Sequence, residues 1–363
     1  MIKDFVNFLE SFKENTLDYT VESGLISICV GCDLNKIETE KVKTILKNRN
    51  PIPNCILINT CVAYDSCIDM SKSILDYVKN NKITKYKVFV IGCGCDQFKL
   101  DYPDFIFIDK KYEFDENSYA AIEQVKLTFE QEEKPLGLIK IQSGCNSACS
   151  YCQIYKIRGK SISESKEIIL KEIQRQLCCG IRDITLTGVN VSQYEDPNDK
   201  SDLLSLLCYI IDNVEGLNSL QTYSIDPAWD KIFDLIKFIK NEPKMTKTLY
   251  LAAQSGSTDV LKRMGRKHDE KRLLDIIKES DGIKLRYDII VGHPGETEED
   301  FRKTLRLIEL SQNHSMVGGQ SKFTAHPGTA SYYMEDKVPE NVIDERFDRL
   351  IALENKMIEG LNI

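Results

Sequence analysis

The stretch Ser-Gly-Cys-Asn-Ser-Ala-Cys-Ser-Tyr-Cys at residues 143–152 decides how the rest of this chain is interpreted. It places Cys145, Cys149 and Cys152 in the spacing C-x3-C-x2-C. Iron–sulfur clusters are held by Cys thiolates and normally take four, so three from one short loop leave one iron open to another ligand. The alternatives are a zinc site or three buried thiols. Zinc sites usually combine two C-x2-C pairs, and no such pair follows Cys152, so the spacing favours a cluster.

A repeated strand-then-helix pattern follows from residue 137 onward. It occurs about six times and predicts a partial (β/α)6 barrel, since a closed barrel has eight repeats. The predicted strands cover residues 137–142, 183–187, 220–225, 248–253, 285–291 and 320–325. The predicted helices cover residues 164–177, 203–213, 231–240, 270–279 and 298–310. Barrel chemistry sits at the carboxyl ends of strands, which is where the cysteine loop falls.

Polar and glycine-containing motifs follow most of these strands. Taken singly, each is more often a turn than a ligand contact. Glycine allows close approach of the backbone to a ligand, and together the motifs would line one edge of the barrel. They lie at residues 187–190, 226–227, 254–257, 292–295 and 326–328.

The first part of the chain predicts a second cysteine site on a parallel α/β sheet. Short apolar runs at 25–30, 55–59 and 87–91 alternate with helical patterns at 37–47 and 69–78. A cysteine follows each run, namely Cys32, Cys61 and Cys93. The carboxyl ends of parallel strands share one edge, so these three would meet in space. The alternatives are coincidence, because cysteine is often buried, and Cys95 as a rival to Cys93.

Composition fits an intracellular enzyme of two domains. The chain has 363 residues, of which 42% are hydrophobic. Thirteen cysteines, an odd number without a secretion signal, predict reduced thiols and metal ligands in the cytoplasm. No apolar run is long enough to span a membrane. The predicted organisation is an N-terminal α/β domain over 1–120, a linker over 121–136, the barrel over 137–330 and a C-terminal helical tail over 331–363.

Ordered motifs over most of the chain resemble those of the radical S-adenosylmethionine (SAM) methylthiotransferases. The resemblance runs from about residue 24 to about residue 354, and many motifs in order make it specific. In the first half it rests on Gly-Cys-x-x-Asn at 31–35, Asn-Thr-Cys at 59–61 and Gly-Cys at 92–93. In the second half it rests on the cysteine loop, Arg-Gly at 158–159, Leu-Thr-Gly-Val-Asn at 186–190, Gln-Ser-Gly-Ser at 254–257, Asp-Ile-Ile-Val-Gly-x-Pro-Gly-Glu at 288–296 and Pro-Gly-Thr at 327–329.

The resemblance implies two 4Fe–4S clusters and SAM as cofactors. One SAM would methylate a sulfur carried on the auxiliary cluster, and a second would yield the radical that removes hydrogen from the substrate carbon. The product would carry C–S–CH3, and an external flavodoxin- or ferredoxin-like protein would supply the electron. The expected ligands are, for the SAM-cleaving cluster, Cys145, Cys149 and Cys152, and, for the auxiliary cluster, Cys32, Cys61 and Cys93.

The same resemblance indicates residues for SAM and substrate. The SAM pocket would be formed by Tyr151, Thr187, Gly188, Asn190, Gln254, Ser255, Gly256 and Ser257. Substrate contacts are expected from Arg158, Arg263, Arg266 and His293.

Three departures from the family bear on the substrate. His293 stands where an aromatic apolar residue is usual, and Ala252-Ala253 replace a common Pro-Leu pair. Family members usually end with a small β-barrel, for which a helical pattern at 341–360 followed by Ile363 leaves no room. Residues 331–363 also carry 4 Lys+Arg against 8 Asp+Glu, which disfavours contact with phosphates.

The sequence therefore favours a peptide or protein substrate, such as the precursor of a ribosomally made natural product. The alternative is tRNA, modified at adenosine 37. A further alternative is a radical SAM enzyme whose auxiliary cluster transfers electrons, and the non-enzyme alternative is an iron-sensing or scaffold protein.

Overall fold

The chain forms two compact units, which are described separately. The computed structural model describes residues 2–12, 17–22, 25–30, 33–47, 54–62, 65–81, 83, 86–108, 137–311, 315–316 and 319–361. Unit 1 comprises Met1–Leu138 and Ile157–Gly159, and unit 2 comprises Ile139–Lys156 and Lys160–Ile363. The predicted linker at 121–136 and the predicted ligand Cys32 lie outside the described residues. Among the described residues, no helix has the length and apolarity needed to cross a membrane.

Unit 1 is built on a five-stranded sheet in the order β1-β2-β3-β4-β5. Strands β2 (Leu25–Val30), β3 (Cys55–Thr60), β4 (Lys87–Gly92) and β5 (Ile106–Phe107) run parallel. Strand β1 (Leu17–Glu22) pairs with β2 in the antiparallel sense. The central three strands were predicted, and the two edge strands were not. Strand β5 has only two residues, whereas β1 alternates apolar with polar residues, which is the signal of a half-buried strand and could have identified it.

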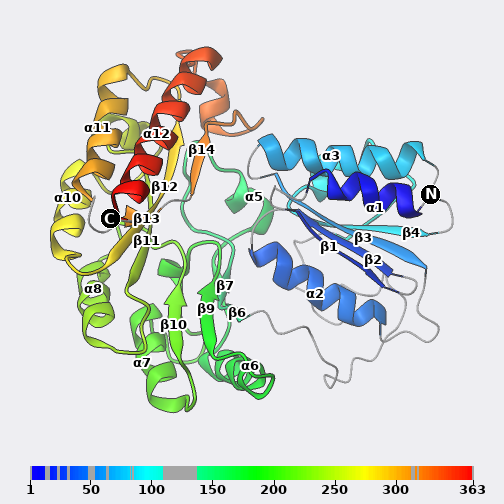
Figure 1. Cartoon of the computed structure of the whole chain (residues 1–363), viewed down its shortest axis with the longest axis horizontal. Coiled ribbons are helices and arrows are strands. Elements are labelled where there is room, and N and C mark those ends of the chain that lie inside the picture. Colours follow the sequence, from blue (N-terminus) through cyan, green and yellow to red (C-terminus); the bar gives the residue numbers. More distant parts are fainter. Residues whose placement is uncertain are drawn as a thin grey trace. The chain divides into compact units, whose positions relative to one another are not determined.

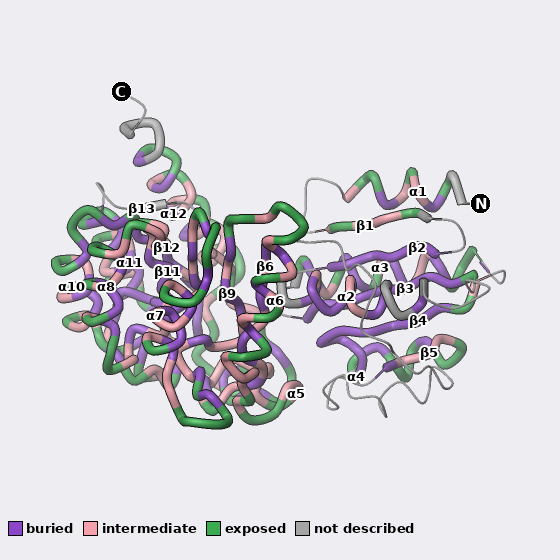
Figure 2. The backbone as a smooth tube through the Cα atoms, turned by 90° about the horizontal axis from the view of Figure 1, so that it is seen from below, coloured by how far each residue is buried: buried purple, intermediate pink, exposed green. Residues whose placement is uncertain are grey.

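Helices cover both faces of this sheet. Helix α2 (Asp33–Lys47) lies on one face, and α1 (Ile2–Glu10) and α3 (Asp65–Asn80) lie on the other (Figure 1). Every residue of β2 and β3 is therefore buried (Figure 2). A short helix, α4 (Cys95–Phe98), follows β4 directly.

Unit 2 repeats strand then helix, as the sequence predicts. One sheet has the order β10-β9-β6, and a second has β11-β12-β13 with β14 also paired to β12. An isolated parallel bridge between Ile225 and Leu251 links the edges of β10 and β11. The strands are β6 (Leu138–Lys140), β9 (Asp183–Thr187), β10 (Ser219–Thr222), β11 (Thr248–Gln254), β12 (Lys284–Val291), β13 (Ser315–Met316) and β14 (Gln320–Lys322).

The helices of unit 2 lie along the outer side of these strands (Figure 1). They are α6 (Lys166–Cys178), α7 (Leu203–Asn213), α8 (Ile232–Asn241), α9 (Thr258–Arg263), α10 (Glu270–Glu279), α11 (Glu298–Leu310) and α12 (Glu340–Leu361). Several begin at side-chain caps, as where Asp202, Asp269 and Thr297 accept backbone N–H groups at the starts of α7, α10 and α11.

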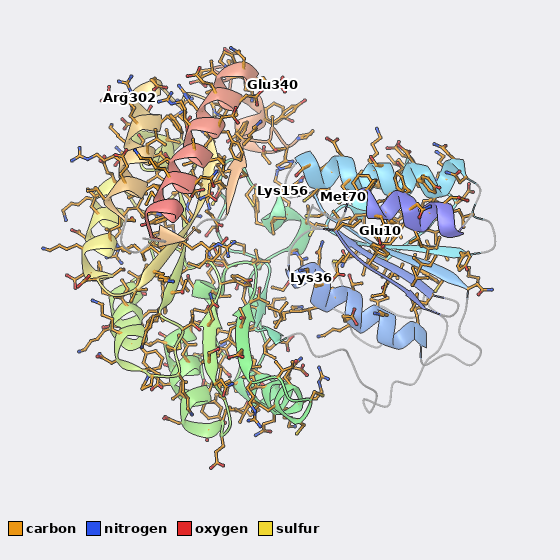
Figure 3. The ribbon with its side chains drawn as sticks, viewed as in Figure 1. Glu10, Lys36, Met70, Lys156, Arg302 and Glu340 are labelled. Carbon is orange, nitrogen blue, oxygen red and sulfur yellow. The ribbon has the colours of Figure 1, made fainter. Side chains whose placement is uncertain are left out.

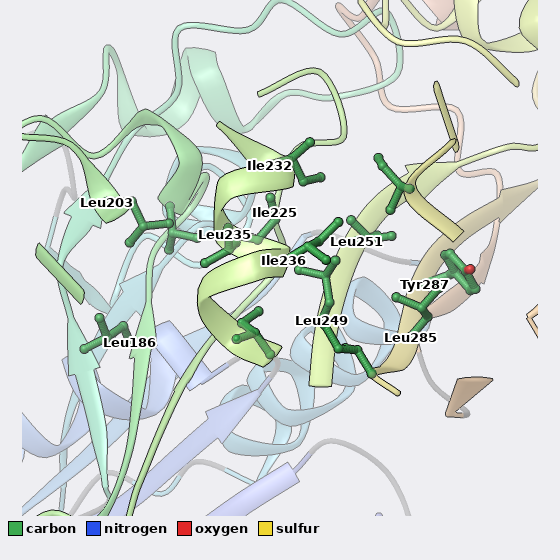
Figure 4. Close-up of a cluster of buried hydrophobic side chains, with 14 of the residues drawn as sticks. Leu186, Leu203, Ile225, Ile232, Leu235, Ile236, Leu249, Leu251, Leu285 and Tyr287 are labelled. Atoms are coloured by element: carbon green, nitrogen blue, oxygen red, sulfur yellow. The ribbon is translucent and has the colours of Figure 1, made fainter. Parts of the chain in front are cut away.

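Buried and partly exposed side chains alternate along the strands of unit 2, so one face of each strand is buried and the other is partly accessible to solvent. In β12, residues Leu285, Tyr287, Ile289 and Val291 are buried, and the residues between them are intermediate. The buried set joins one large apolar core between strands and helices (Figure 4). The other side carries polar residues, including the Asp288 carboxylate, which accepts hydrogen bonds from Ser224 and Tyr250.

Helix α12 is held to unit 2 by charged and apolar contacts. It begins at Glu340, and Arg302 marks the neighbouring helix α11 (Figure 3). Arg346 donates to Glu296 Oε1 at 2.9 Å, and both side chains are almost fully buried. Further along, Glu354 is 5% exposed and accepts a hydrogen bond from Gln320 Nε2.

Candidate active site

The cysteine loop is anchored by segments far away in the sequence. It follows β7 (Gln142–Ser143), which pairs with β8 (Ile162–Ser163). Ser150 donates its N–H to Met264 O at 2.9 Å and its hydroxyl to Arg263 O at 2.8 Å. Ser331 donates its N–H to Ser150 O and its hydroxyl to Ser150 Oγ, both at 2.8 Å. The loop therefore depends on the end of α9 and on η3 (Ala330–Tyr333).

Two glutamines that were not predicted as site residues fix the other end of the loop. Gln142 donates to Gly144 O at 2.6 Å and to Ser161 Oγ at 2.8 Å. Gln193 accepts the N–H of Asn146 at 2.8 Å, and its amide nitrogen lies 3.8 Å from Cys145 Sγ. Gln142 is fully buried at the end of a strand, and a polar residue in that position is the signal that could have identified it.

Arg266 is an interior residue beside the loop. Its guanidinium donates to Cys149 Sγ at 3.5 Å, to Asp226 Oδ1 at 3.0 Å and to Ala252 O at 3.0 Å. The neighbouring His268 lies 3.7 Å from Asp226, and burial lowers its pKa to about 4. These contacts tie Arg266 to the cysteine loop, and its predicted role as a substrate contact stays a prediction.

The three loop thiols fit a cluster. Burial, followed by the proximity of Cys149 and Cys145, raises the pKa of Cys152 to about 11. The thiols therefore lie close enough to oppose each other's ionisation, and a bound metal centre is what would hold all three as thiolates. No group of three His, Cys, Asp or Glu side chains in the described part of the chain is arranged to hold a single metal ion. A four-iron cluster is wider than a single ion, so the separation of the three loop thiols is compatible with such a cluster.

The two predicted SAM segments are both immobilised by hydrogen bonds. Thr187 is buried, and Asn190 donates its N–H to Gln142 Oε1 at 3.0 Å. A Cβ added at Gly188 would lie 2.9 Å from Gln142 O, so this position requires glycine. The first segment is thus joined to the residue that positions the cysteine loop.

The second segment, residues 254–257, rests on helix α11. Gln254 adopts a left-handed conformation with φ 66°. Gly256 donates its N–H to Thr304 Oγ1 at 2.9 Å, and Ser257 donates to Asp300 Oδ1 at 2.5 Å. A Cβ at Gly256 would lie 2.6 Å from Lys303 O. Backbone N–H groups and strained turns of this kind are common where a ligand is held.

The remaining predicted residues of unit 2 differ in exposure. His293 is fully buried, lies 2.8 Å from Ser331 Oγ through Nε2, and has a pKa lowered to about 4 by burial. Arg263 forms an ion pair with Asp336 and donates to Pro294 O. Tyr151 lies against Cys149 and Arg266, and burial raises its pKa. Hence His293 supports η3 and the loop, and a substrate role for it remains a prediction.

In unit 1 the described cysteines stand where the sequence predicted. Cys61 and Cys93 follow β3 and β4, and Cys93 donates its N–H to Thr60 O at 3.1 Å. Both are buried. The Cys95 thiol instead points to the carbonyls of Val90 and Ile108, at 3.5 Å from each. This contact favours Cys93 over Cys95 as a ligand.

Two family motif residues explain the geometry of this edge. Asn35 donates from Nδ2 to Val30 O at 2.8 Å and to Thr60 O at 3.3 Å, which ties the ends of β2 and β3 together. A Cβ at Gly92 would lie 2.2 Å from Thr60 O, and its φ is 110°. Only glycine permits the turn that brings Cys93 beside Cys61.

Arg158 belongs to the segment that is grouped with unit 1. It donates to Glu38 Oε1 at 2.9 Å and to Cys93 Sγ at 3.3 Å, and its side chain is 5% exposed. A guanidinium in this position would balance the negative charge of a Cys93 thiolate, and the predicted role of Arg158 as a substrate contact stays a prediction.

The fold and the loop together define a radical SAM enzyme. Residues 139–308 match the model of the radical SAM superfamily. Among solved structures, the chain is similar to the radical SAM methyltransferase TsrM from Kitasatospora setae, with a TM-score of 0.57, 16% identity and coverage of 82% of this chain and 69% of that one. It is also similar to the cobalamin-dependent radical enzyme OxsB, with a TM-score of 0.51, 16% identity and coverage of 91% of this chain and half of OxsB. These likenesses concern the fold.

Curated relatives define the family. The tRNA-2-methylthio-N(6)-dimethylallyladenosine synthase of Finegoldia magna is 30% identical over 96% of this chain and 81% of its own length. The synthase of the same name from Clostridium tetani is 29% identical over 100% of this chain and 86% of its own length. The chain belongs to the radical SAM methylthiotransferase family.

Proposed function

We propose that this enzyme transfers a methylthio group to an adenosine of tRNA. The observation that carries the proposal is the 30% identity, over most of both chains, to a relative named for that reaction. Further relatives with the same name match over nearly the whole chain. They favour the tRNA alternative over the peptide substrate that the sequence alone favours.

The residues of both cysteine sites suit the cofactors that this reaction needs. The loop thiols of unit 2 would hold one 4Fe–4S cluster, and Cys61 and Cys93, with Cys32, would hold the other. The clusters and SAM would supply the radical and the sulfur. The protein itself would orient these groups: Arg266 donates to Cys149 Sγ and would balance the charge of a cluster-bound thiolate there, and Gly256 and Ser257 present a rigid turn beside α11.

Location, organisation and reductant follow as parts of the same proposal. A tRNA substrate places the enzyme in the cytoplasm. The domain limits proposed from the sequence, 1–120 and 137–330, assign one cluster to each domain. A flavodoxin- or ferredoxin-like protein would deliver the electron.

Nucleoside mass spectrometry of tRNA tests the proposal. A strain that lacks this gene, and any other methylthiotransferase acting on tRNA, should contain no 2-methylthio adenosine, and the wild-type gene should restore it. A gene carrying Cys149→Ala should fail, whereas Cys208→Ala should succeed, because Cys208 is a half-buried residue of α7. Unmodified tRNA in the complemented strain, together with a peptide that gains a methylthio group, would overturn the proposal in favour of a peptide substrate.

A further inference from the structure

We propose that Tyr332 and Tyr333 form a stacking platform for unpaired RNA bases that flank the target nucleotide. This inference rests on the proposed tRNA function and names a contact surface for it. The platform is defined by these two tyrosines, with Lys337 at its border.

The two rings are unusually exposed for their size. Tyr332 is 41% exposed and Tyr333 is 71% exposed, and they are the aromatic members of the exposed large hydrophobic set in the described part of the chain. Their centroids lie 5.1 Å apart at an interplanar angle of 85°. Two edge-to-face rings present surfaces in different directions, so they can contact successive bases that are splayed apart.

Hydrogen bonds place this pair beside the cysteine loop. Ser331, which directly precedes Tyr332, is bonded twice to Ser150, and Ser150 lies between Cys149 and Cys152. His293 adds a third contact to Ser331 from its buried ring. The backbone that carries the tyrosines is thus fixed to the loop that would hold the SAM-cleaving cluster.

Cations border the rings. Lys337 Nζ lies 5.8 Å from the centroid of Tyr332 and donates to the carbonyls of Ser331 and Tyr332. Lys156 of α5 (Ile154–Arg158), labelled in Figure 3, is exposed and donates to Gly328 O at 2.5 Å, four residues before Tyr332 in the sequence. The nearby Asp336 is neutralised by Arg263. Aromatic rings beside lysines are the combination that binds single-stranded nucleic acid, with rings under bases and cations near phosphates.

The chemistry favours RNA over an apolar protein partner. Among the exposed large hydrophobic residues in the described part of unit 2, only the two tyrosines lie in η3, and the charged residues Glu335, Asp336 and Lys337 follow them in the sequence. A loop of unpaired bases also matches the surroundings of a target adenosine that must reach a site inside the protein.

Binding of a stem-loop RNA tests the platform. The probe is a labelled RNA whose unpaired loop carries N6-dimethylallyladenosine, titrated anaerobically with the reconstituted enzyme. Replacing both tyrosines with Ala should weaken binding by at least about 30-fold, since each base–aromatic stack contributes roughly 5- to 150-fold and two stacks are lost. Replacing both with Phe should preserve affinity within about twofold, because the rings remain.

Two further measurements distinguish the possible failures. Iron content and SAM cleavage without RNA should be unchanged in both variants, which shows that the loop remains intact. If the alanine pair binds the stem-loop as tightly as the wild type, the platform is wrong and the tRNA function stands. If the wild type does not bind the stem-loop at all, both the platform and the proposed function are wrong.

Discussion

Replacing Glu354 with Gln should make unit 2 less sensitive to pH. Burial raises the pKa of Glu354 from its ordinary value of 4.5 to about 7. One oxygen accepts from Gln320, and Oε2 has no hydrogen-bond partner among the described residues. The folded protein therefore binds a proton here more tightly than the unfolded chain does. The stability that results is present below pH 4.5 and is lost as the pH rises through 7.

The size of the effect follows from the two pKa values. Between pH 6 and pH 8, ionisation of a carboxyl with these values would lower the free energy of unfolding by about 1.3 kcal/mol. The Gln variant should not show this part of the decline. Glu296, whose pKa is also raised to about 7, contributes equally to both proteins and cancels in the comparison.

Urea unfolding at pH 6 and pH 8 measures the difference. Trp229, the single tryptophan of the chain, packs against the core of unit 2 and reports its unfolding by fluorescence. Glu345→Gln on the same helix is the matched control, because its side chain is 68% exposed. Equal pH dependence in the wild type and in Glu354→Gln would refute the reasoning, and so would a steeper decline in the variant.

Three further predictions concern the site. The reconstituted wild type should carry about eight irons per chain, and replacing the three loop cysteines with Ala should leave about four, as a colorimetric iron assay would measure. Eight irons in that variant would contradict the assignment of the loop as a cluster site. Arg266→Met should lower the free energy of unfolding by about 3 kcal/mol, because it leaves the Asp226 carboxylate without its ion-pair partner. The control Lys267→Met removes an exposed charge and should change the free energy of unfolding little. Equal urea midpoints for the two variants would contradict this prediction. Gly256→Ala should lower the free energy of unfolding by about 1–3 kcal/mol, because the added Cβ would clash with Lys303 O. An unchanged melting temperature would contradict this, since it would mean that α11 can move away from the new side chain without loss of stability.

Strands and helices whose hydrophobic pattern and end signals are both present in the sequence were predicted with the limits that the structure shows. The strand at 183–187 and the helices at 203–213, 270–279 and 298–310 agree with the structure. These helices begin at capping residues that the sequence displays directly. The predicted strand at 320–325 is shorter, as β14 ends at Lys322 ahead of the turn at His326-Pro327. The fold class was predictable because hydrophobic periodicity is a local property of the sequence.

The site was predictable only in part. Cysteine type and spacing revealed the loop, since thiolate ligands must come from cysteine. The burial of Arg266 and His293 was not visible, because their partners Cys149 and Ser150 lie 117 and 143 positions away in the sequence. Cys178 and Cys179 are exposed at the end of α6, although cysteine is a residue type that is often buried. Long-range contacts determine these outcomes, and no local pattern encodes them.

The tether between Ser150 and Ser331 has a consequence for biosynthesis. The two residues are 181 positions apart, so the anchor of the cysteine loop is synthesised long after the loop itself. Closing so large a chain segment requires most of unit 2 to have folded around it. A nascent chain on the ribosome would present three unanchored thiols. We therefore expect iron to be inserted after the polypeptide is released, with the completed unit 2 as the substrate of the assembly machinery.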